Sequence, residues 1–135
     1  MDDVQIVLAR YRISKAYECI KESQLMYENE MLSGSVNRSY YAIFNAARSV
    51  LALDGIDRSK HSGVIAYFQK EYIKTGIFAR DLSDIIQDAF HIRQITDYQD
   101  YYVVSKDEVK SQLENAKQFC DEMKEYLENR ISENG

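Results

Sequence analysis

Apolar residues recur along this chain at alternating steps of three and four positions, the spacing that places them on one face of a helix. Five such stripes can be traced, and polar segments separate them. The sequence therefore predicts five helices joined by short connectors. The stripes are Ile6, Ala9, Ile13, Ala16 and Ile20; Val36, Tyr40, Ile43, Ala47 and Val50; Ile65, Phe68 and Tyr72; Leu82, Ile86 and Ala89; and Val109, Leu113, Ala116, Cys120, Met123 and Leu127.

Polar residues and glycines indicate where these helices begin and end. The first stripe fades around Glu28, and residues 33–35, Ser-Gly-Ser, offer a break followed by an N-cap. The fifth helix has the clearest start, because Ser105 and Glu108 can form a capping box in which each side chain satisfies the other's backbone amide. The second helix is expected to stop at Asp54 and Gly55, the third near Thr75 and Gly76, and the fourth is expected to begin near Asp81.

The composition agrees with a helical protein. The 135 residues include no proline and only five glycines, too few breakers for the many short strands and turns of a β-sandwich or barrel. Hydrophobic residues make up 45% and charged residues 29%, as in ordinary globular proteins. No internal repeat or linker divides the chain. We expect an all-α antiparallel bundle of about five helices, forming a single domain over residues 1–135.

The sequence carries no sign of a membrane segment or a secreted framework. No apolar run approaches the roughly 18 residues that span a bilayer, and the acidic start at Asp2 and Asp3 lacks the pattern of a signal sequence. The two cysteines, Cys19 and Cys120, are too few for a zinc site or a disulfide framework. We therefore expect a cytoplasmic protein with reduced cysteines in its core.

Charge is unevenly distributed along the chain. The net charge of −5 disfavours strong non-specific binding to nucleic acid. Residues 35–80 nevertheless carry seven basic against three acidic side chains, whereas residues 81–104 carry one basic and five acidic side chains. The basic middle can receive a polyanion or an acidic partner, or it can be an ordinary solvated surface.

One arginine occupies a position that the helical pattern assigns to the buried side. Four residues beyond Ala89, the fourth stripe arrives at Arg93. A buried guanidinium needs a partner. Asp97, one turn later, can supply a simple ion pair within the helix. Alternatively, Arg93 faces a cleft or a subunit interface, where its planar fork can receive a phosphate.

Two further groups of polar residues need an explanation. Asn37, Tyr41, Asn45 and Arg48 follow one another at helical spacing beside the second apolar stripe. They can form hydrogen bonds between helices, or they can line a pocket shared with Arg93. At the end of the fourth helix, residues 97–102 contain three tyrosines and two aspartates, a polar aromatic segment typical of a site or an interface.

Other candidate sites are weaker. Asp88 and His91 have the spacing of helical metal ligands, but a di-iron bundle needs a second such pair and more inward carboxylates, so we expect no metal. His61 falls in the first turn of the third helix, where solvent exposure or a capping role is expected before catalysis. The glycines are widely separated and form no phosphate-binding loop, and we expect no cofactor.

Three segments, taken together, carry a family pattern. They are Asn37-Arg-Ser-Tyr-Tyr-Ala-Ile-Phe-Asn-Ala-Ala-Arg48, Lys60-His-Ser-Gly-Val-Ile-Ala-Tyr-Phe68 and Arg93-x-x-x-Asp97-Tyr98. In order and spacing they resemble the small stand-alone HEPN proteins of bacteria and archaea. The likeness runs from about Val4 to Leu127, almost the whole chain.

This resemblance implies a helical bundle that forms a homodimer and is often encoded beside a minimal nucleotidyltransferase in toxin–antitoxin or defence modules. Active members of the family are metal-independent endoribonucleases. They use an arginine followed after four to six residues by a histidine, brought together from two subunits across a cleft. A base removes the ribose 2′-OH proton, the oxygen attacks the adjacent phosphorus, and a cation stabilises the developing charge.

The chain departs from that motif at the histidine. Counting from Arg93, the corresponding positions hold Tyr98, Gln99 and Asp100, so only the arginine carries over. Because a general base contributes about 10²–10⁴-fold in rate, the expected ribonuclease activity is weak or degenerate. Asp97 or Asp100 is the candidate substitute base.

The resemblance also implies a possible modification. Some antitoxin nucleotidyltransferases of these modules adenylylate a tyrosine close to the active motif of their partner. The spacing singles out none of the tyrosines in the segment after Arg93. The candidates are Tyr98, Tyr101 and Tyr102.

We therefore expect a homodimer that works with a minimal nucleotidyltransferase and binds RNA or a nucleotide at a dimer cleft. The stripes on the second and fourth helices, with their aromatic and polar flanks, are expected to supply the two-fold interface beyond the monomer core. A non-catalytic nucleotide- or partner-binding module and a structural adaptor are the alternatives, so the assignment as an enzyme stays open. The candidate catalytic residues are Arg93, Asp97 and Asp100, and the candidate binding residues are Asn37, Tyr41, Asn45, Arg48 and Tyr98.

Overall fold

The computed structural model of the chain describes residues 1–99 and 102–134. Over these residues it contains five α-helices and no β-strand, which confirms the predicted all-α bundle. A short π-helical segment, η1 (Gln69–Ile73), continues the third helix directly. The α-helices are α1 (Asp3–Glu28), α2 (Leu32–Leu53), α3 (His61–Phe68), α4 (Arg80–Tyr98) and α5 (Lys106–Asn134).

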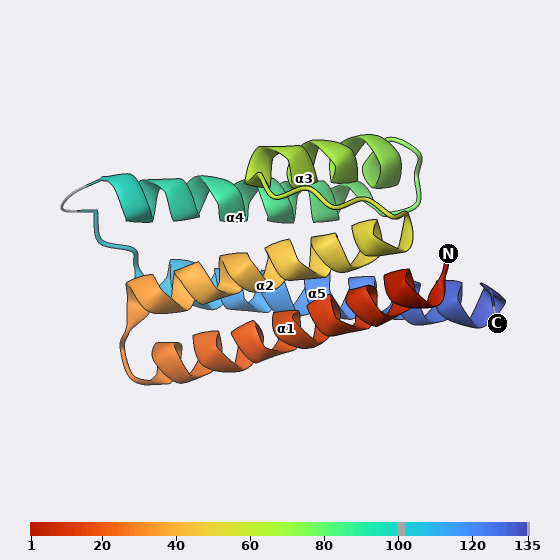
Figure 1. Cartoon of the computed structure of the whole chain (residues 1–135). Helices are drawn as coiled ribbons and strands as arrows, with labels where there is room; N and C mark the ends of the chain where they lie inside the picture. The colour runs from red at the N-terminus through yellow and green to blue at the C-terminus, as the bar shows by residue number, and fades with distance from the viewer. Residues whose placement is uncertain (100–101, 135) are drawn as a thin grey trace.

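Helix α2 lies at the centre of the bundle and contacts each of the other four α-helices. In Figure 1, α1 and α2 run antiparallel side by side, α5 lies behind them, and α3 and α4 cover the opposite side of α2. Both ends of the chain lie at the same end of the bundle. The arrangement follows from α2, whose buried residues extend over most of its circumference and therefore need several helices to cover them, while its partly exposed polar residues lie along one line.

The apolar stripes of α2 and α4 lie inside the core of the single chain. Leu82, Ile86 and Ala89 of α4 are at most 1% exposed, and the α2 stripe is buried as completely. The bundle itself thus covers the two stripes, and the parts of these helices left for the predicted two-fold interface are their aromatic and polar flanks. Exposed apolar side chains lie elsewhere, and the first turns of α1 present Val4, Val7 and Tyr11 together.

The turn between α1 and α2 comes earlier than the sequence indicated. Glu30, with a φ of 61°, lies in this turn, and α2 begins at Leu32, so the expected break at residues 33–35 is wrong. Ser35 is buried inside the helix, and its hydroxyl donates to the backbone carbonyl of Ser23 in α1, at 2.8 Å. A serine whose hydroxyl is satisfied by the neighbouring helix has no need to act as a cap.

The other boundaries follow the sequence more closely. The Glu108 amide donates to the Ser105 hydroxyl oxygen at 3.1 Å, and the Ser105 amide donates to the Glu108 carboxylate at 3.4 Å, which confirms the capping box of α5. Helix α4 begins at Arg80, one residue before the predicted start. In α3, Val64 is buried in place of the expected Ile65, since a four-residue step to Phe68 suits the wider turn that follows.

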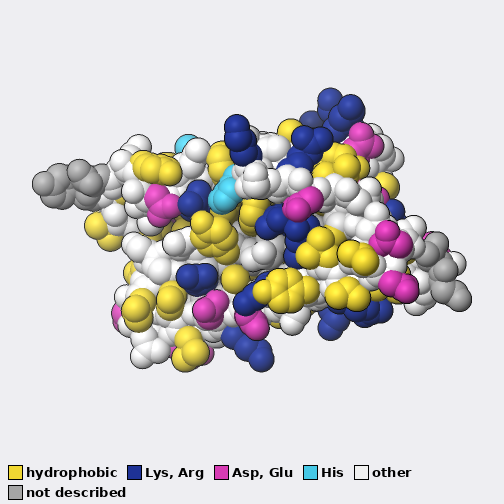
Figure 2. Space-filling model, viewed as in Figure 1, with side chains coloured by type: hydrophobic (Ala, Val, Ile, Leu, Met, Phe, Trp, Pro, Cys, Tyr) yellow, Lys and Arg dark blue, Asp and Glu magenta, His cyan; other side chains and the backbone are white. Residues whose placement is uncertain are grey.

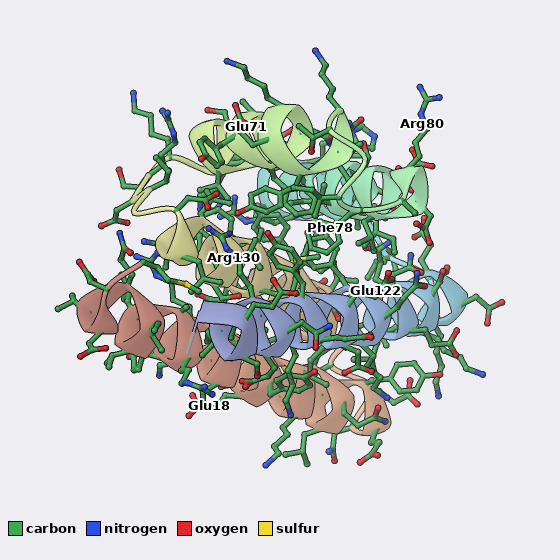
Figure 3. The ribbon with its side chains drawn as sticks, turned by 90° about the vertical axis from the view of Figure 1, so that its right-hand side faces the viewer. Glu18, Glu71, Phe78, Arg80, Glu122 and Arg130 are labelled. Carbon is green, nitrogen blue, oxygen red and sulfur yellow. The ribbon has the colours of Figure 1, made fainter. Side chains whose placement is uncertain are left out.

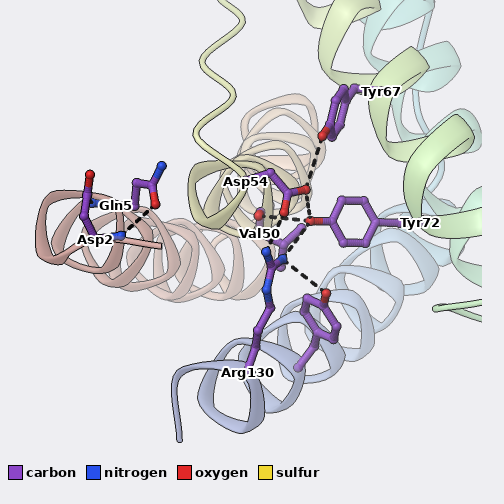
Figure 4. A network of polar contacts seen from close by, with 8 residues as sticks. Asp2, Gln5, Val50, Asp54, Tyr67, Tyr72 and Arg130 are labelled. Carbon is purple, nitrogen blue, oxygen red and sulfur yellow. Dashed lines mark hydrogen bonds and ion pairs between the residues drawn. The ribbon is translucent and has the colours of Figure 1, made fainter. Parts of the chain in front are cut away.

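A polar network joins the end of α2 to α3, η1 and α5 (Figure 4). The Asp54 carboxylate accepts from Arg130 Nη2 at 2.6 Å, from the Tyr67 hydroxyl at 3.3 Å, and from the Tyr72 hydroxyl. Burial and the nearby Asp54 carboxylate raise the pKa of Tyr72. Figure 3 shows Arg130 between α5 and the end of α2. The sequence marked Asp54 only as a helix stop, whereas the structure makes it a junction of four elements.

Replacing Asp54 should destabilise the fold markedly. Asp54→Ala removes the carboxylate partner of the Arg130 guanidinium and one of the two acceptors of the buried Tyr72 hydroxyl, the other being the Val50 carbonyl, and we expect the free energy of unfolding to fall by about 2–3 kcal/mol. Urea unfolding followed by circular dichroism measures this change. Asp84→Ala, on the exposed side of α4, is the matched control and should change stability by less than about 0.5 kcal/mol. Equal effects of the two substitutions would contradict a stabilising role of the network.

Candidate functional site

Arg93 lies at the seam between α4 and α2, with 18% of its side chain exposed. Its Nη2 donates to the Tyr41 hydroxyl at 3.2 Å. The guanidinium carbon lies 5.3 Å from the centre of the Tyr40 ring and 5.4 Å from that of Tyr41. Cation–π contacts with two rings and one hydrogen bond fix the guanidinium beside the polar line of α2, by which we mean Asn37, Tyr41, Asn45 and Arg48. The structure thus brings together Arg93 and Tyr41, two of the residues singled out in the sequence.

Asp97 forms the ion pair with Arg93 that its position one turn later permits. The distance from Arg93 Nε to Asp97 Oδ2 is 3.3 Å. The Nε–H does not point at this oxygen, however, and it makes no hydrogen bond with any described residue. The ion pair therefore leaves part of the hydrogen-bonding capacity of Arg93 unused.

Two more buried polar atoms near this seam lack partners among the described residues. They are Asn37 Oδ1 in α2 and Thr96 Oγ1 in α4. Because α2 and α4 run antiparallel in Figure 1, the turn of α4 after Arg93 faces the turn of α2 before Tyr41. Buried polar groups without partners are uncommon in folded proteins and indicate a place where water or a ligand group binds.

The rest of the polar line on α2 serves several purposes. The Asn45 side-chain amide donates to the Tyr41 carbonyl within the same helix, at 2.9 Å. Tyr41 and Asn45 also line an open pocket of about 360 Å³ between α1 and α2, and Arg93 does not line it. The polar line therefore makes one hydrogen bond to another helix, from Arg93 to Tyr41, and it also lines a pocket beside α1. The pocket is lined by Tyr11, Lys15, Glu18, Cys19, Glu22, Arg38, Tyr41 and Asn45.

His61, the first residue of α3, lies in the same site. Its Nδ1 is 2.6 Å from the Tyr40 hydroxyl oxygen, and its ring stacks on Phe44 with the ring centres 4.2 Å apart. The ring of Tyr41 meets it edge-on at 6.0 Å. The expectation of a solvent-exposed or capping histidine is wrong, because His61 is half-buried and Lys60 holds the N-cap position.

The hydrogen bond between Tyr40 and His61 indicates which ring nitrogen carries the proton. Tyr40 is 1% exposed, and His61 Nδ1 is the one partner of its hydroxyl among the described residues. A buried hydroxyl should donate its proton, which makes Nδ1 the acceptor and leaves the proton of the neutral ring on Nε2. Burial, followed by the positive charges of Arg93 and Arg48, lowers the pKa of His61.

Arg48 lies at the other side of this histidine. Its guanidinium carbon is 5.7 Å from the centre of the Phe44 ring. Its Nη2 lies 3.0 Å from Asp57 Oδ1, and the same oxygen accepts from Arg12 Nη2 at 2.9 Å. These hydrogen bonds lower the pKa of Asp57. Two guanidinium groups share one carboxylate, so this side of the site keeps a net positive charge.

These contacts join the residues into one continuous group, which we call the arginine–aromatic cluster. Figure 2 shows basic and histidine side chains close together near the middle of this face, where α2, α3 and α4 meet. The sequence identified its two ends but not His61, since nothing in the spacing of the chain links that residue to Tyr40. The cluster consists of Arg93, Tyr40, Tyr41, His61, Phe44 and Arg48.

The aspartate–tyrosine segment after α4 is only partly described. Tyr98 is 76% exposed and forms no part of the cluster. The Tyr102 hydroxyl donates to the Glu108 carboxylate at 3.2 Å, at the start of α5. Asp100 and Tyr101, which the sequence put forward as a candidate base and a candidate modification site, lie outside the described residues.

Two classes of site find no support in the part of the chain that the structure describes. Residues 1–99 and 102–134 contain no group of three or more histidine, cysteine, aspartate or glutamate side chains placed to hold a metal ion. Within the same ranges, no helix is both long and apolar enough to cross a membrane. The arginine–aromatic cluster therefore remains the strongest candidate for a functional site.

Comparison with known proteins gives a consistent result. Residues 9–126 match the HEPN domain. A Thermotoga maritima protein named "UPF0332 protein" is 32% identical over 128 residues, which cover 95% of this chain and 96% of that protein. The Methanocaldococcus jannaschii protein "Putative toxin MJ0142" is 34% identical over 115 residues, or 85% and 78% of the two chains. A second protein of that organism, "Putative toxin MJ0605", is 29% identical over 115 residues, 85% of each chain.

Removing the Tyr40 hydroxyl should raise the pKa of His61. In the wild type we expect this pKa below the ordinary value of about 6.5, because the ring is partly buried between two arginines. Tyr40→Phe removes the hydroxyl that stabilises the neutral ring, so the pKa should rise. NMR titration of the two histidine rings measures it. Tyr17→Phe, which removes a hydroxyl bonded to Asp121, should leave the His61 pKa unchanged. A pKa that is equal in wild type and Tyr40→Phe would show that Tyr40 does not donate to the ring.

Proposed function

Because this chain belongs to the HEPN domain family, we propose that it is the HEPN component of a toxin–antitoxin or defence module and that it binds RNA at the arginine–aromatic cluster. Its metal-independent ribonuclease activity is weak or degenerate. Two relatives bear the name of toxins, which supports the module. The observation that carries the RNA site is the position of Arg93, held by Tyr41 at a seam with unpartnered polar atoms. RNA as the ligand fits a cytoplasmic location.

Arg93 supplies the charge that phosphodiester cleavage requires. Its guanidinium keeps an unused donor at Nε and can stabilise the negative charge that develops on the phosphoryl oxygens. Asp97, the nearest candidate base, is held in the ion pair with Arg93, which favours its role as a partner of the arginine over proton transfer. We retain Asp97 and Asp100 as the candidate bases of a slow reaction, because none of the motif positions 98–100 holds a histidine.

Basic and aromatic side chains around Arg93 suit the binding of single-stranded RNA. Arg38 lies 6.0 Å from the centre of the Tyr41 ring, on the opposite part of the polar line from Arg48. Aromatic rings stack on bases, and arginines pair with phosphates in a salt-dependent manner. In this proposal Asn37, Tyr41, Asn45 and Arg48 line the RNA-binding surface, and Tyr98 flanks it.

The partners we propose are a second copy of the chain and a minimal nucleotidyltransferase. Tyr98 is the best placed of the three candidate tyrosines for modification, since its side chain is 76% exposed. The Tyr102 hydroxyl is already bonded to Glu108. The alternative function, a non-catalytic nucleotide- or partner-binding module, is favoured by one observation, the lack of the motif histidine after Arg93.

RNA binding should depend on Arg93. We expect Arg93→Ala to weaken binding of a generic single-stranded RNA about tenfold at low salt, because it removes the guanidinium that faces the phosphate. Fluorescence anisotropy measures the affinity, and cleavage of the same RNA is followed in the presence of a chelator. The matched control is Arg80→Ala, an exposed arginine at the start of α4. Asp97→Asn tests the candidate base.

The pattern of activity across these variants separates the two functions. Slow cleavage by the wild type that is lost in Arg93→Ala and reduced in Asp97→Asn supports the weak ribonuclease. Cleavage at equal trace levels in all proteins indicates contamination and favours the non-catalytic binding module. Equal affinities of wild type, Arg93→Ala and Arg80→Ala would exclude Arg93 as the RNA contact.

We also expect the chain to form a homodimer through α1. The first turns of this helix expose Val4, Val7 and Tyr11, which lie on one face at steps of three and four residues. Val7→Glu should convert the dimer to a monomer in light scattering at micromolar concentration, because it places a charge in the apolar contact. Val103→Glu, at a residue that is also highly exposed, should leave the dimer intact. A wild-type chain that is monomeric under these conditions would contradict the predicted homodimer.

A further inference from the structure

The arginine–aromatic cluster contains a histidine that the proposed chemistry has not yet used. His61 comes from α3, far along the chain from Arg93, yet the two residues contact the same tyrosines of α2. Arg48 lies on its other side, beyond the Phe44 ring. Its Nε2 has no hydrogen-bond partner among the described residues. A polar ring nitrogen therefore stands free between two guanidinium groups.

We propose that His61 is a phosphate-contacting residue of the RNA site, and that a phosphodiester bound between Arg93 and Arg48 is held more tightly when the imidazole is protonated. The protein then takes up a proton when RNA binds. The proposal rests on the RNA-binding function proposed above and names the residue that makes this binding depend on pH. His61 thereby stands in space near Arg93, where the family motif would place a histidine by sequence.

The surroundings of His61 hold its ring in one orientation. Tyr40 is buried and donates to Nδ1, and Phe44 stacks on the face of the ring. With Nδ1 occupied, Nε2 is the nitrogen left to contact a ligand. In the neutral ring Nε2 already carries a proton, so it can donate to a phosphoryl oxygen at any pH. Protonation takes place at Nδ1, which then donates to the Tyr40 oxygen, and it gives the ring a full positive charge that strengthens the contact at Nε2.

The charges that face His61 explain why protonation of its ring should accompany ligand binding. From α2 the ring meets Tyr40, Tyr41 and Arg48, and from α4 it meets Arg93. Asp97 offsets the charge of Arg93, and Asp57 is shared by Arg48 and Arg12, so the group as a whole stays positive. Lys60, the neighbour of His61 in the chain, adds an exposed positive charge. No carboxylate among the described residues bonds to the imidazole itself.

The sign of the linkage follows from these charges. In the free protein, burial and the two arginines disfavour the imidazolium, which lowers the pKa of His61. A bound phosphodiester carries one negative charge between the arginines and favours the imidazolium. The pKa is then higher in the complex than in the free protein. Affinity must rise as the pH falls through this range, because the protonated form binds more tightly.

A phosphodiester that neither titrates nor cleaves tests this directly. The probe is a short 2′-O-methylated oligouridylate, which lacks the nucleophilic 2′-hydroxyl and carries no group that titrates between about pH 5 and pH 8. Its affinity is measured at about pH 5.5 and pH 7.5 for wild type, His61→Asn and Arg93→Ala. We expect the wild type to bind several-fold more tightly at the lower pH, because more of the imidazole is protonated there in the complex than in the free protein. In His61→Asn this dependence should disappear.

A measurement on the wild type makes the test independent of any folding defect in the variant. The chain has two histidines, and His91 lies exposed on the other side of α4 from Arg93. NMR titration with and without the oligouridylate should show a raised pKa for His61 in the complex and no change in the His91 signal. Equal behaviour of the two rings would overturn the proposal.

The outcomes separate this inference from the function on which it rests. Binding that needs Arg93, rises at low pH and loses its pH dependence in His61→Asn supports both. Binding that needs Arg93 but is equal at the two pH values leaves the RNA site standing and overturns the role of His61. Failure of the wild type to bind the oligouridylate at low salt at either pH overturns both. A pH dependence that persists in His61→Asn assigns the proton to another group and also overturns the proposal.

Discussion

The burial of the apolar residues of α2 is the constraint on which the rest of the structure depends. These residues extend over most of the helix circumference, and four other helices cover them. Each covering helix also has to accommodate the polar groups that α2 carries. Close contact with α1 is possible because the hydroxyls of Ser23, Ser35 and Ser39 bond to one another and to the backbone. At its far end, Asp54 plays the same part for Tyr72 and Arg130.

The arginine–aromatic cluster follows from the same constraint. Tyr40 is too buried to reach water, so its hydroxyl needs an acceptor, and the start of α3 supplies His61. Tyr41, one residue on, faces α4, where Arg93 takes the place that periodicity would give to an apolar side chain. Several polar atoms that the core does not satisfy, Arg93 Nε, Asn37 Oδ1 and Thr96 Oγ1, thereby lie along the seam between α2 and α4. A site at this seam uses hydrogen-bonding capacity that packing has left over, as at Arg93 Nε.

Much of the fold was predictable because burial leaves a period in the sequence. The apolar stripes predicted all five helices, and Arg93 became a candidate site residue because it interrupts one of the stripes. The errors concern residues whose partners come from elsewhere in the chain. The local sequence predicts that Ser35 is a cap and that His61 is exposed. The structure instead places Ser35 against Ser23 and His61 against Tyr40. Capping and exposure are local inferences, whereas a hydrogen bond between helices depends on tertiary contact that spacing does not encode.

The ion pair between Arg93 and Asp97 sets the balance between a binding site and a catalytic one. A phosphate that approaches Arg93 competes with a carboxylate 3.3 Å from its Nε, and the ground state of the free protein is stabilised by that pair. Such an arrangement lowers affinity for any single phosphate, and it favours ligands that bring several contacts at once. In the proposed function an RNA strand does so, since it can contact Arg93, Arg48 and the partly exposed Tyr41 and His61 together. Under that proposal, the ion pair favours a polymeric ligand over a free anion.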